Sequence, residues 1–406
     1  MKVKVLPEDF QVSEIAEVTI SRETDAFSVY ALSKCRWDTF DLIGYLSKRL
    51  RISPSDISIG GIKDRHGRTS QTLTIRTQGH LPSSITENNF TLKRLGYSGE
   101  PIRSRDIAGN RFTIVLRDMS EEEYEDLLLN MEEVRECGFP NYYDEQRFGS
   151  ARHGLGFMGK ELFLGRSEQA LKLYLWPSRR DRGDVKRFKR CVIANWGRWE
   201  ECTEKVPERY KVIMEYLCRR GCRQAFTKAL TRIGRPFLMF ALNAYQSFLF
   251  NQILREYLLV LSTFYRIHLT ELPFAYGSLL FYRKPCGECL SRMRSTKLPV
   301  PGHNSIIEDE DVRAVTETIL SGEGITLRDL KVKKLHKTAV GGIERDMIVV
   351  PQDLRIVEKG PDERYPPRIK CRMEFLLPRG SYATMLLKRL SLSRTQPIFC
   401  AGKKQT

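Results

Sequence analysis

The chain has 406 residues, of which 41% are apolar, and this supports a folded protein with ample core, either as one large domain or as two to three domains of ordinary size. Its 67 lysines and arginines outnumber its 50 aspartates and glutamates, which leaves a formal net charge of +17. This charge favours a polyanionic partner, with nucleic acid first and an anionic membrane surface second. Because the first ten residues contain no apolar segment, we expect neither a signal peptide nor a membrane anchor there.

The first third of the chain alternates predicted strands with predicted helices. Asp38 stands where a helix N-cap is favoured, and Ser120 with Glu123 forms a capping box before a helix that ends at Gly138. The expected elements are strands at 10–17, 72–77 and 111–119 and helices at 39–50 and 121–137. Such a mixture predicts an α+β fold.

One turn in this region, GGIKDRHGRTSQ at residues 60–71, concentrates charge between two glycines and the strand that follows. A carboxylate fixed there, on Asp64, can act as a base or a nucleophile because the flanking strands hold it still. The neighbouring cations would keep it ionised and would attract phosphate: Lys63, Arg65, His66 and Arg68. Taken alone, however, the stretch is better explained as an ordinary charged hairpin turn.

The longest uncharged stretch, residues 236–254, predicts a buried helix. Its asparagines and glutamines would be costly in lipid, which argues against a membrane span. An apolar stripe recurs at helical spacing and can face a core: Leu238, Leu242, Tyr245, Leu249 and Ile253.

A basic run precedes this helix, and strands return after it. Residues 178–190 hold seven basic residues against two acidic ones, which indicates either a solvated helix face or a contact with an RNA backbone. Residues 368–378 predict a strand and residues 382–390 a last helix. A β-rich beginning and end around a helical middle predict one domain inserted into another.

Ten scattered cysteines without a secretory signal predict reduced thiols in a cytoplasmic protein. Four of them could form a thiolate zinc site, although no ordered ligand series surrounds them: Cys218, Cys222, Cys286 and Cys289. We therefore expect free thiols and no bound metal. Motifs typical of metal-dependent hydrolysis, phosphate-binding loops and nucleophile elbows are missing from the sequence.

Four further motifs combine polar and aromatic residues. They are PEDFQVSE, GNRFTIVLR, PNYYDEQRFGS and LPRGSYATMLLKRL, at residues 7–14, 109–117, 140–150 and 377–390. Each one alone is most simply a turn with core aromatics. Together with the turn at 60–71, and in this order, they resemble the TruD family of tRNA pseudouridine synthases over nearly the whole chain.

The resemblance implies an α+β fold with two parts. A pseudouridine synthase catalytic domain would have a mixed or antiparallel sheet formed by both chain ends, and an α-rich α+β TRUD domain would be inserted into it. The expected boundaries are 1–137 and 350–406 for the catalytic domain and 138–349 for the insertion. The motif at 140–150 would mark the entrance to the inserted domain, with a structural or RNA-positioning role favoured over a chemical one.

The resemblance also implies roles for six residues. Asp64 would be the catalytic aspartate, and Lys4 could pair with it to keep it charged. Phe112 would stack on a flipped uracil, and Asn110 would hydrogen-bond the substrate. Two further substrate-contacting positions are matched by Phe10 and Tyr382.

The implied activity is that of an isomerase, an intramolecular transferase that converts uridine to pseudouridine in tRNA, with position 13 of the D-stem as the expected target. The expected partner is tRNA and no membrane, and neither a cofactor nor a metal is required. One alternative is a non-catalytic RNA-binding protein or RNA chaperone that keeps the fold, which predicts decay of Asp64, Asn110 and Phe112. A zinc-dependent nucleic-acid enzyme that uses the cysteine pairs is another.

Overall fold

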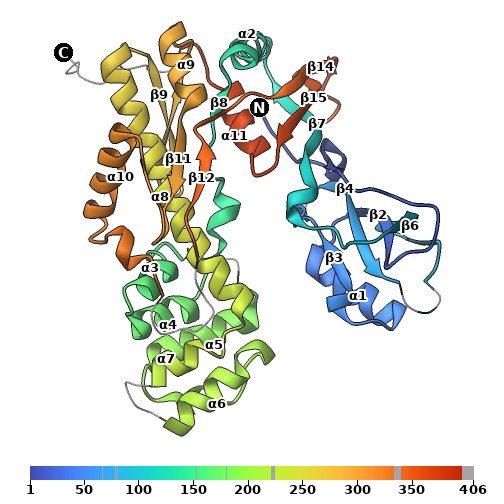
Figure 1. Cartoon of the computed structure of the whole chain (residues 1–406), viewed down its shortest axis with the longest axis vertical. Coiled ribbons are helices and arrows are strands. Elements are labelled where there is room, and N and C mark those ends of the chain that lie inside the picture. Colours follow the sequence, from blue (N-terminus) through green and yellow to red (C-terminus); the bar gives the residue numbers. More distant parts are fainter. Residues whose placement is uncertain are drawn as a thin grey trace. The chain divides into compact units, whose positions relative to one another are not determined.

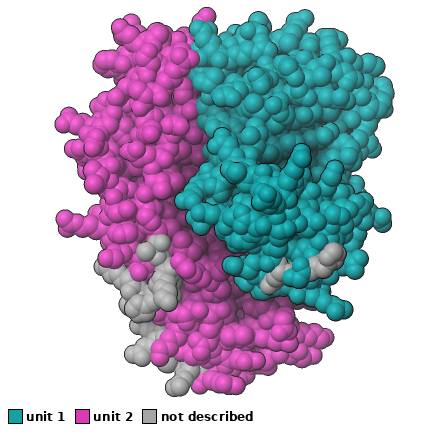
Figure 2. All heavy atoms as spheres, turned by 45° about the vertical axis from the view of Figure 1, so that its right-hand side comes forward, with its two compact units in different colours: residues 1–139, 349–397 teal, residues 140–348, 398–406 magenta. Residues whose placement is uncertain are grey.

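The computed structural model describes residues 1–65, 67–77, 79, 81–151, 153–179, 181–220, 225–332 and 340–395. His66, Cys222 and Cys400 lie outside these ranges. The chain divides into two compact units, residues 1–139 with 349–397 and residues 140–348 with 398–406 (Figure 2). The first unit is thus built from both ends of the chain and the second from its middle.

A mixed, nine-stranded sheet forms the centre of the first unit in the described part of the chain (Figure 1). The strands run in the order β14-β15-β7-β1-β4-β2-β6-β5, and β3 pairs with β4. The pairing of β1 with β4 is parallel, and the other neighbours along this order are antiparallel. The strands are β1 (Phe10–Ala16), β2 (Phe27–Cys35), β3 (Ile57–Ile59), β4 (Arg68–Arg76), β5 (Ser84–Glu87), β6 (Phe90–Ser98), β7 (Ile107–Met119), β14 (Gln352–Pro361) and β15 (Ile369–Pro378).

The join between the two chain ends is made by β15, which pairs along most of its length with β7. Alternate residues of β15 are buried, as the alternating sequence predicts: Cys371, Met373, Phe375 and Leu377. The expected α+β fold with a mixed sheet from both ends of the chain is therefore confirmed.

Three helices accompany this sheet: α1 (Thr39–Leu50), α2 (Glu121–Cys137) and α11 (Ala383–Leu390). The carboxylate of Asp38 accepts the amides of Phe40 and Asp41, and Ser120 and Glu123 cap α2 reciprocally, so both predicted caps are confirmed. The apolar face of α1 packs against strand residues in one cluster with β2 and β4. The Asp38 cap and the packing of α1 fix where the loops between β2 and β4 begin and end.

The second unit is mainly helical (Figure 1). Its helices are α3 (Met158–Phe163), α4 (Ser167–Leu175), α5 (Gly183–Ala194), α6 (Lys211–Arg220), α7 (Ala225–Leu230), α8 (Arg235–Tyr265), α9 (Gly287–Ser295) and α10 (Glu310–Gly322). Two strand pairs complete it: β9 (Leu269–Phe274) with β10 (Gly277–Tyr282), and β11 (Lys297–Val300) with β12 (Ile343–Asp346). The short strands β8 (Phe139–Pro140) and β13 (Ile348–Val349) lie where the chain passes between the units.

Helix α8 is the buried helix that the sequence predicts. All five residues of its predicted stripe are buried, and polar residues on other faces find partners inside the unit. The Asn251 amide bonds both main-chain groups of Tyr143, at 2.8 and 2.9 Å, and the Gln246 amide donates to the Pro301 carbonyl at 2.6 Å. Among the described residues, no helix is long and apolar enough to cross a membrane.

The motif at 140–150 lies within this packing. Phe148 is fully buried, the Tyr142 hydroxyl donates to the Leu280 carbonyl at 3.2 Å, and Arg147 donates to the Ser247 hydroxyl at 3.1 Å. These contacts favour a structural role for the motif over RNA positioning or chemistry.

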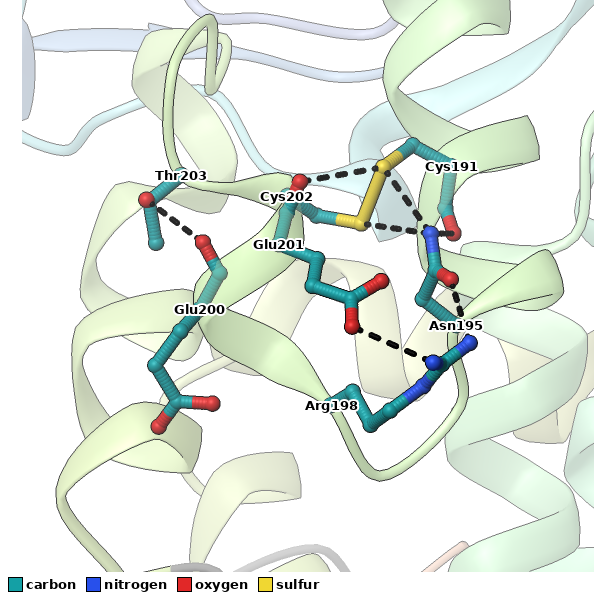
Figure 3. The surroundings of a disulfide bond; sticks show 7 residues. All are labelled: Cys191, Asn195, Arg198, Glu200, Glu201, Cys202 and Thr203. Carbon is teal, nitrogen blue, oxygen red and sulfur yellow. Dashed lines mark hydrogen bonds and ion pairs between the residues drawn. A yellow bond between two sulfur atoms is a disulfide. The ribbon is translucent and has the colours of Figure 1, made fainter.

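Cys191 and Cys202 form a disulfide bond, so the expectation that all cysteines are reduced thiols is wrong for this pair (Figure 3). Cys191 lies in α5, and Cys202 ends a short 3-10 helix, Trp199–Cys202. The helix ends place the two Cα atoms 5.9 Å apart, within the distance that a disulfide requires. A spacing of 11 residues without any paired pattern gave no signal of this contact in the sequence.

Replacing both cysteines with serine is expected to lower the free energy of unfolding by about 3 kcal/mol, because the short closed loop no longer restricts the unfolded chain. Denaturant unfolding of the variant and of the unchanged protein measures the difference. Peptide mapping of the unchanged protein without reductant should recover the Cys191–Cys202 link. Cys286→Ser, at an exposed free thiol, is the matched control and should change little. Equal stability of the double variant and the unchanged protein would contradict a stabilising disulfide.

Candidate active site

Three side chains hold the main chain of the turn that carries Asp64. The Ser104 hydroxyl donates to the Gly60 carbonyl at 2.7 Å, and the Gln71 amide donates to the Gly61 carbonyl at 3.3 Å. Thr39, at the start of α1, bonds both the amide and the carbonyl of Lys63, each at 3.2 Å. With its main-chain groups held in this way, the turn is part of the fold and not a free hairpin tip.

Two glycines let the turn approach its neighbours closely. A Cβ at Gly60 would lie 2.3 Å from the Ile107 side chain, and one at Gly67 would lie 2.5 Å from the Phe10 carbonyl oxygen. At Gly67 the obstacle is main chain, so this position requires glycine, whereas a side chain at Gly60 would force the Ile107 side chain to move. The close approach at Gly67 brings the end of the turn against the first residue of β1.

Lys34, near the end of β2, holds the same turn by hydrogen bonds to its main chain. Its side chain is only 2% exposed, and its amine donates to the carbonyls of Trp37 at 2.9 Å, Lys63 at 3.3 Å and Asp64 at 2.9 Å. Burial lowers the pKa of Lys34, while the nearby carboxylates of Asp38 and Asp64 act in the opposite direction. Three carbonyls from two loops are thus gathered on one amine.

Lys63 points into the protein. Its amine lies 2.6 Å from the fully buried carboxylate of Glu14 and donates to the Asn110 side-chain oxygen at 2.7 Å, and its own side chain is 9% exposed. Glu14 and Asn110 face each other across β1 and β7. The expectation that Lys63 attracts RNA phosphate is therefore wrong, because the buried Glu14 neutralises it inside the fold.

Asp64 faces Lys4. The two side chains form a short ion pair, and the carboxylate keeps 15% of its surface exposed. The Lys4 amine also lies 4.0 Å from the centre of the Phe10 ring, which holds it from the other side. Lys4 adopts a left-handed backbone conformation, with φ of 60°. The pairing of Lys4 with Asp64 that the resemblance implies is thus present.

Phe10 is positioned by the residue before it in the PEDF motif. Both oxygens of the buried Asp9 carboxylate accept from Arg117 Nε at 3.0 Å, and Arg117 also reaches Asp362 at 3.1 Å and Glu363 at 2.9 Å. Hydrogen bonds from Lys370 and Arg117 lower the pKa of Glu363 to about 2, so this carboxylate stays charged at neutral pH. The network ties the N-terminal segment to β7 and to the C-terminal part of the sheet.

The expected aromatic residues gather on these strands. Phe112 is 6% exposed and stacks on Phe375 with a ring separation of 5.2 Å, while Phe10 meets its edge at 6.2 Å. Asn110, two residues before Phe112, is paired across the sheet with Leu377 of β15. Tyr382 is half-buried and caps α11, four residues after β15 ends. The structure thus brings Lys4, Phe10, Asp64, Asn110 and Phe112 together, with Tyr382 on the adjoining loop.

An open cavity of about 340 Å³ adjoins Lys4. Its lining contains three cations and no acidic residue: Lys4, Arg36 and Arg65, with Val5, Leu6 and Pro7. Arg36 and Arg65 are exposed, whereas Arg68 lies near Glu8 at 3.3 Å on the surface. A cavity of this kind suits an anionic group such as phosphate.

Three or more histidine, cysteine or acidic side chains do not come together as a metal site anywhere in the described ranges. Of the four cysteines weighed for zinc, Cys222 lies outside those ranges, and Cys286 is exposed at the start of α9. Burial raises the pKa of Cys289 to about 12, so this thiol stays protonated at neutral pH.

The comparison with known proteins gives the family. The sequence pattern of the family described as tRNA pseudouridine synthase D (TruD) matches residues 1–268 and 287–390. The chain belongs to the TruD family. A relative from Methanococcus maripaludis, named probable tRNA pseudouridine synthase D 1, is 31% identical over 96% of this chain and 99% of its own length. The tRNA pseudouridine synthase D of Leptospira interrogans is 29% identical over 96% of each chain.

The fold comparison leads to the same family. A solved structure of a TruD protein from Methanosarcina mazei superimposes with a TM-score of 0.67 at 25% sequence identity. It covers 96% of this chain and 93% of its own. The TruD architecture therefore extends over both units of the chain.

Three charged residues of this TruD site escaped the sequence analysis: Glu14, Lys34 and Arg117. Glu14 follows the buried Phe10 and Val12 at alternate positions of β1, and Lys34 follows Tyr30 and Leu32 in the same way on β2. A charged residue in register with a buried face is a signal of an internal ion pair or a functional site. Arg117 gives no such signal, because it follows the buried Leu116 directly.

Lys63→Met is expected to lower the free energy of unfolding by about 3–5 kcal/mol, because it leaves the Glu14 carboxylate buried without its cation. A second variant that also carries Glu14→Gln removes the stranded charge and should regain a large part of that loss. Urea unfolding of the two single variants, the double variant and the unchanged protein gives the coupling energy. Additive losses would contradict the buried pair.

Proposed function

We propose that this chain isomerises uridine to pseudouridine at position 13 in the D-stem of tRNA, as an intramolecular transferase that uses Asp64. The observation that carries the proposal is the Asp64 carboxylate: it is held on a rigid turn, paired with Lys4 and still partly exposed. Family membership over nearly the whole chain supports the reaction type.

The proposed reaction breaks the bond between N1 of uracil and C1′ of the ribose, turns the detached base and joins C5 to C1′. The C5 proton leaves and N1 gains a proton, so that the product is an isomer of the substrate. Asp64 acts in one of two ways: its carboxylate adds to C1′, or it removes the 2′ proton to give a glycal. Both routes need an ionised carboxylate, which the Lys4 ammonium favours.

The target base must leave its stack to reach Asp64, since the atoms that react lie inside the helix. We assign the contacts with the flipped uracil to Phe10, Phe112, Asn110 and Tyr382. Lys63 holds the side-chain oxygen of Asn110, so the amide NH2 group is directed away from that bond and can donate to a uracil carbonyl. Phe375 stacks on Phe112 and Phe10 meets it edge to face, so we assign the base to the part of the Phe112 ring that remains exposed.

The phosphates beside the flipped nucleotide are assigned to Arg36 and Arg65. These exposed cations line the cavity next to Lys4, and the formal charge of +17 supports a polyanionic substrate. We infer that the protein works in the cytoplasm, that residues 1–137 and 350–406 act as the catalytic domain, and that residues 138–349 act as the inserted TRUD domain.

A non-catalytic RNA-binding protein is the alternative. It would need no ion pair beside the exposed carboxylate, and nothing would keep Asp64, Asn110 and Phe112 as they are. The short Lys4–Asp64 pair favours the enzyme.

Incubation of the purified protein with unmodified tRNA transcripts tests the proposal. Mapping is expected to find pseudouridine at position 13 that increases with reaction time. A transcript with cytidine at that position should remain unmodified there. Modification at another position only would contradict the target, and no modification of any tRNA would contradict the activity.

Lys4→Met is expected to slow turnover at saturating tRNA by about tenfold or more, because the charged carboxylate loses its partner. Lys4→Arg keeps the cation and should retain more activity. Lys2→Met removes a neighbouring surface cation that pairs with Asp118 at 3.0 Å, and it should change turnover little. Equal rates for Lys4→Met and Lys2→Met would rule out the proposed role of Lys4.

A further inference from the structure

A cavity of about 920 Å³ lies within the second unit, apart from all the residues assigned to the reaction. Residues of α4, α5, the 3-10 helix Glu208–Tyr210 and the start of α8 line it. Its volume is in the range of small-molecule and nucleotide sites. None of the residues that line it takes part in the proposed chemistry at Asp64.

Aromatic side chains form much of the cavity wall: Tyr174, Trp176, Tyr210 and Phe237. The rings of Tyr174 and Phe237 meet edge to face at 5.0 Å, and Tyr174 lies 5.6 Å from Tyr210. Phe237 is 36% exposed although it is a large apolar side chain. Exposed ring surface such as that of Phe237 is a usual platform for nucleic-acid bases.

The acidic residues of the lining are each neutralised by a neighbour. Asp181 pairs with Lys189 at 3.1 Å, and Asp184 lies 3.7 Å from Arg182. Glu208 pairs with Lys211 at 2.6 Å. These pairs leave the charge balance of the cavity to its two remaining arginines.

Arg209 and Arg232 have no ion-pair partner among the described residues, and both are exposed. Each guanidinium is nevertheless held against a ring, Arg209 at 4.7 Å from the centre of Tyr210 and Arg232 at 3.8 Å from that of Tyr216. Arg232 Nη1 also donates to the Lys228 carbonyl at 3.2 Å. The stacking orients each planar group, and the N–H groups that this bond does not use can reach an anion.

One further polar atom has no protein partner. The Nε2 atom of His153, which lines the cavity, is buried without a hydrogen bond in the described part of the chain. The Leu155 amide donates to Nδ1 at 3.1 Å, and burial and the charge of Lys189 lower the pKa of His153. The neutral ring therefore carries its proton on Nε2, which can donate one hydrogen bond. A base edge offers such a partner.

We propose that this cavity binds one unpaired nucleotide of an RNA chain, with its base against Tyr174 and Phe237 and its phosphate at Arg209 and Arg232. The inference rests on the proposed function only in naming tRNA as that RNA. Two unpaired guanidiniums match the single charge of a phosphodiester better than the several charges of a free nucleoside triphosphate. The exposed cations of α5, Arg187 and Arg190 among them, offer further contacts for flanking phosphates.

Equilibrium binding of fluorescein-labelled tRNA transcript and of labelled hexauridylate tests the proposal without any turnover. Arg232→Gln is expected to weaken binding of both probes about tenfold and to reduce the salt slope of log K by about 1, as for one lost phosphate contact. Phe237→Ser should weaken both about tenfold through lost base stacking. Arg328→Gln removes an exposed arginine of the same unit outside the cavity, and it should stay within twofold of the unchanged protein.

Unchanged RNA binding by Arg232→Gln and Phe237→Ser, with thermal unfolding like that of the unchanged protein, would overturn the proposal. Competition with uridine monophosphate separates the sources of the nucleotide. If it bound as tightly as hexauridylate while the variants left tRNA binding intact, the site would serve a free nucleotide and the proposal would fail. If the unchanged protein formed no pseudouridine but the variants still lost RNA binding, the proposed nucleotide site would stand and only the proposed activity would be refuted.

Discussion

The buried amine of Lys34 is the interaction on which the site depends. Taking an ammonium group out of water costs several kcal/mol, so it is tolerated only where its hydrogens find acceptors. Here they find the carbonyls of Trp37, Lys63 and Asp64, which come from two separate loops. Closing both loops on one cation fixes the main chain of Asp64, and its side chain pairs with Lys4. Rigid placement of this kind is what a carboxylate needs to react with one atom of a substrate.

Much of the fold could be predicted because it depends on local patterns. The caps at Asp38 and Ser120, the stripe of α8 and the alternation of β15 each involve residues close in sequence, and the structure confirms them. The inward direction of Lys63 could not be predicted in that way. A cation in a charged turn points inward only if a buried carboxylate can pair with it. The carboxylate of Glu14 belongs to β1, which is far from Lys63 in the sequence. The Cys191–Cys202 bond was missed for a similar reason, since it depends on where two helices end.

In our proposals, the first unit carries the chemistry and the second binds RNA. The first holds the carboxylate, its paired lysine and a small cationic cavity. The second holds a larger cavity of aromatic rings and unpaired arginines, within the stretch where the sequence carries its basic run. Arg179, Arg182, Arg187 and Arg190 of that run are exposed, but Lys189 is buried and bonds Asp181 and the Trp176 carbonyl, so part of the run serves the fold. The net charge thus arises from cations with different tasks.

The most direct test of the account is single-turnover pseudouridine formation by Asp64→Asn at saturating tRNA. This change keeps the size of the side chain and removes only its charge, and Asp41→Asn on the exposed side of α1 is the matched control. The account predicts that Asp64→Asn binds tRNA as the unchanged protein does but forms no pseudouridine above background, while Asp41→Asn reacts normally. Pseudouridine formation by Asp64→Asn at the rate of the unchanged protein would contradict it.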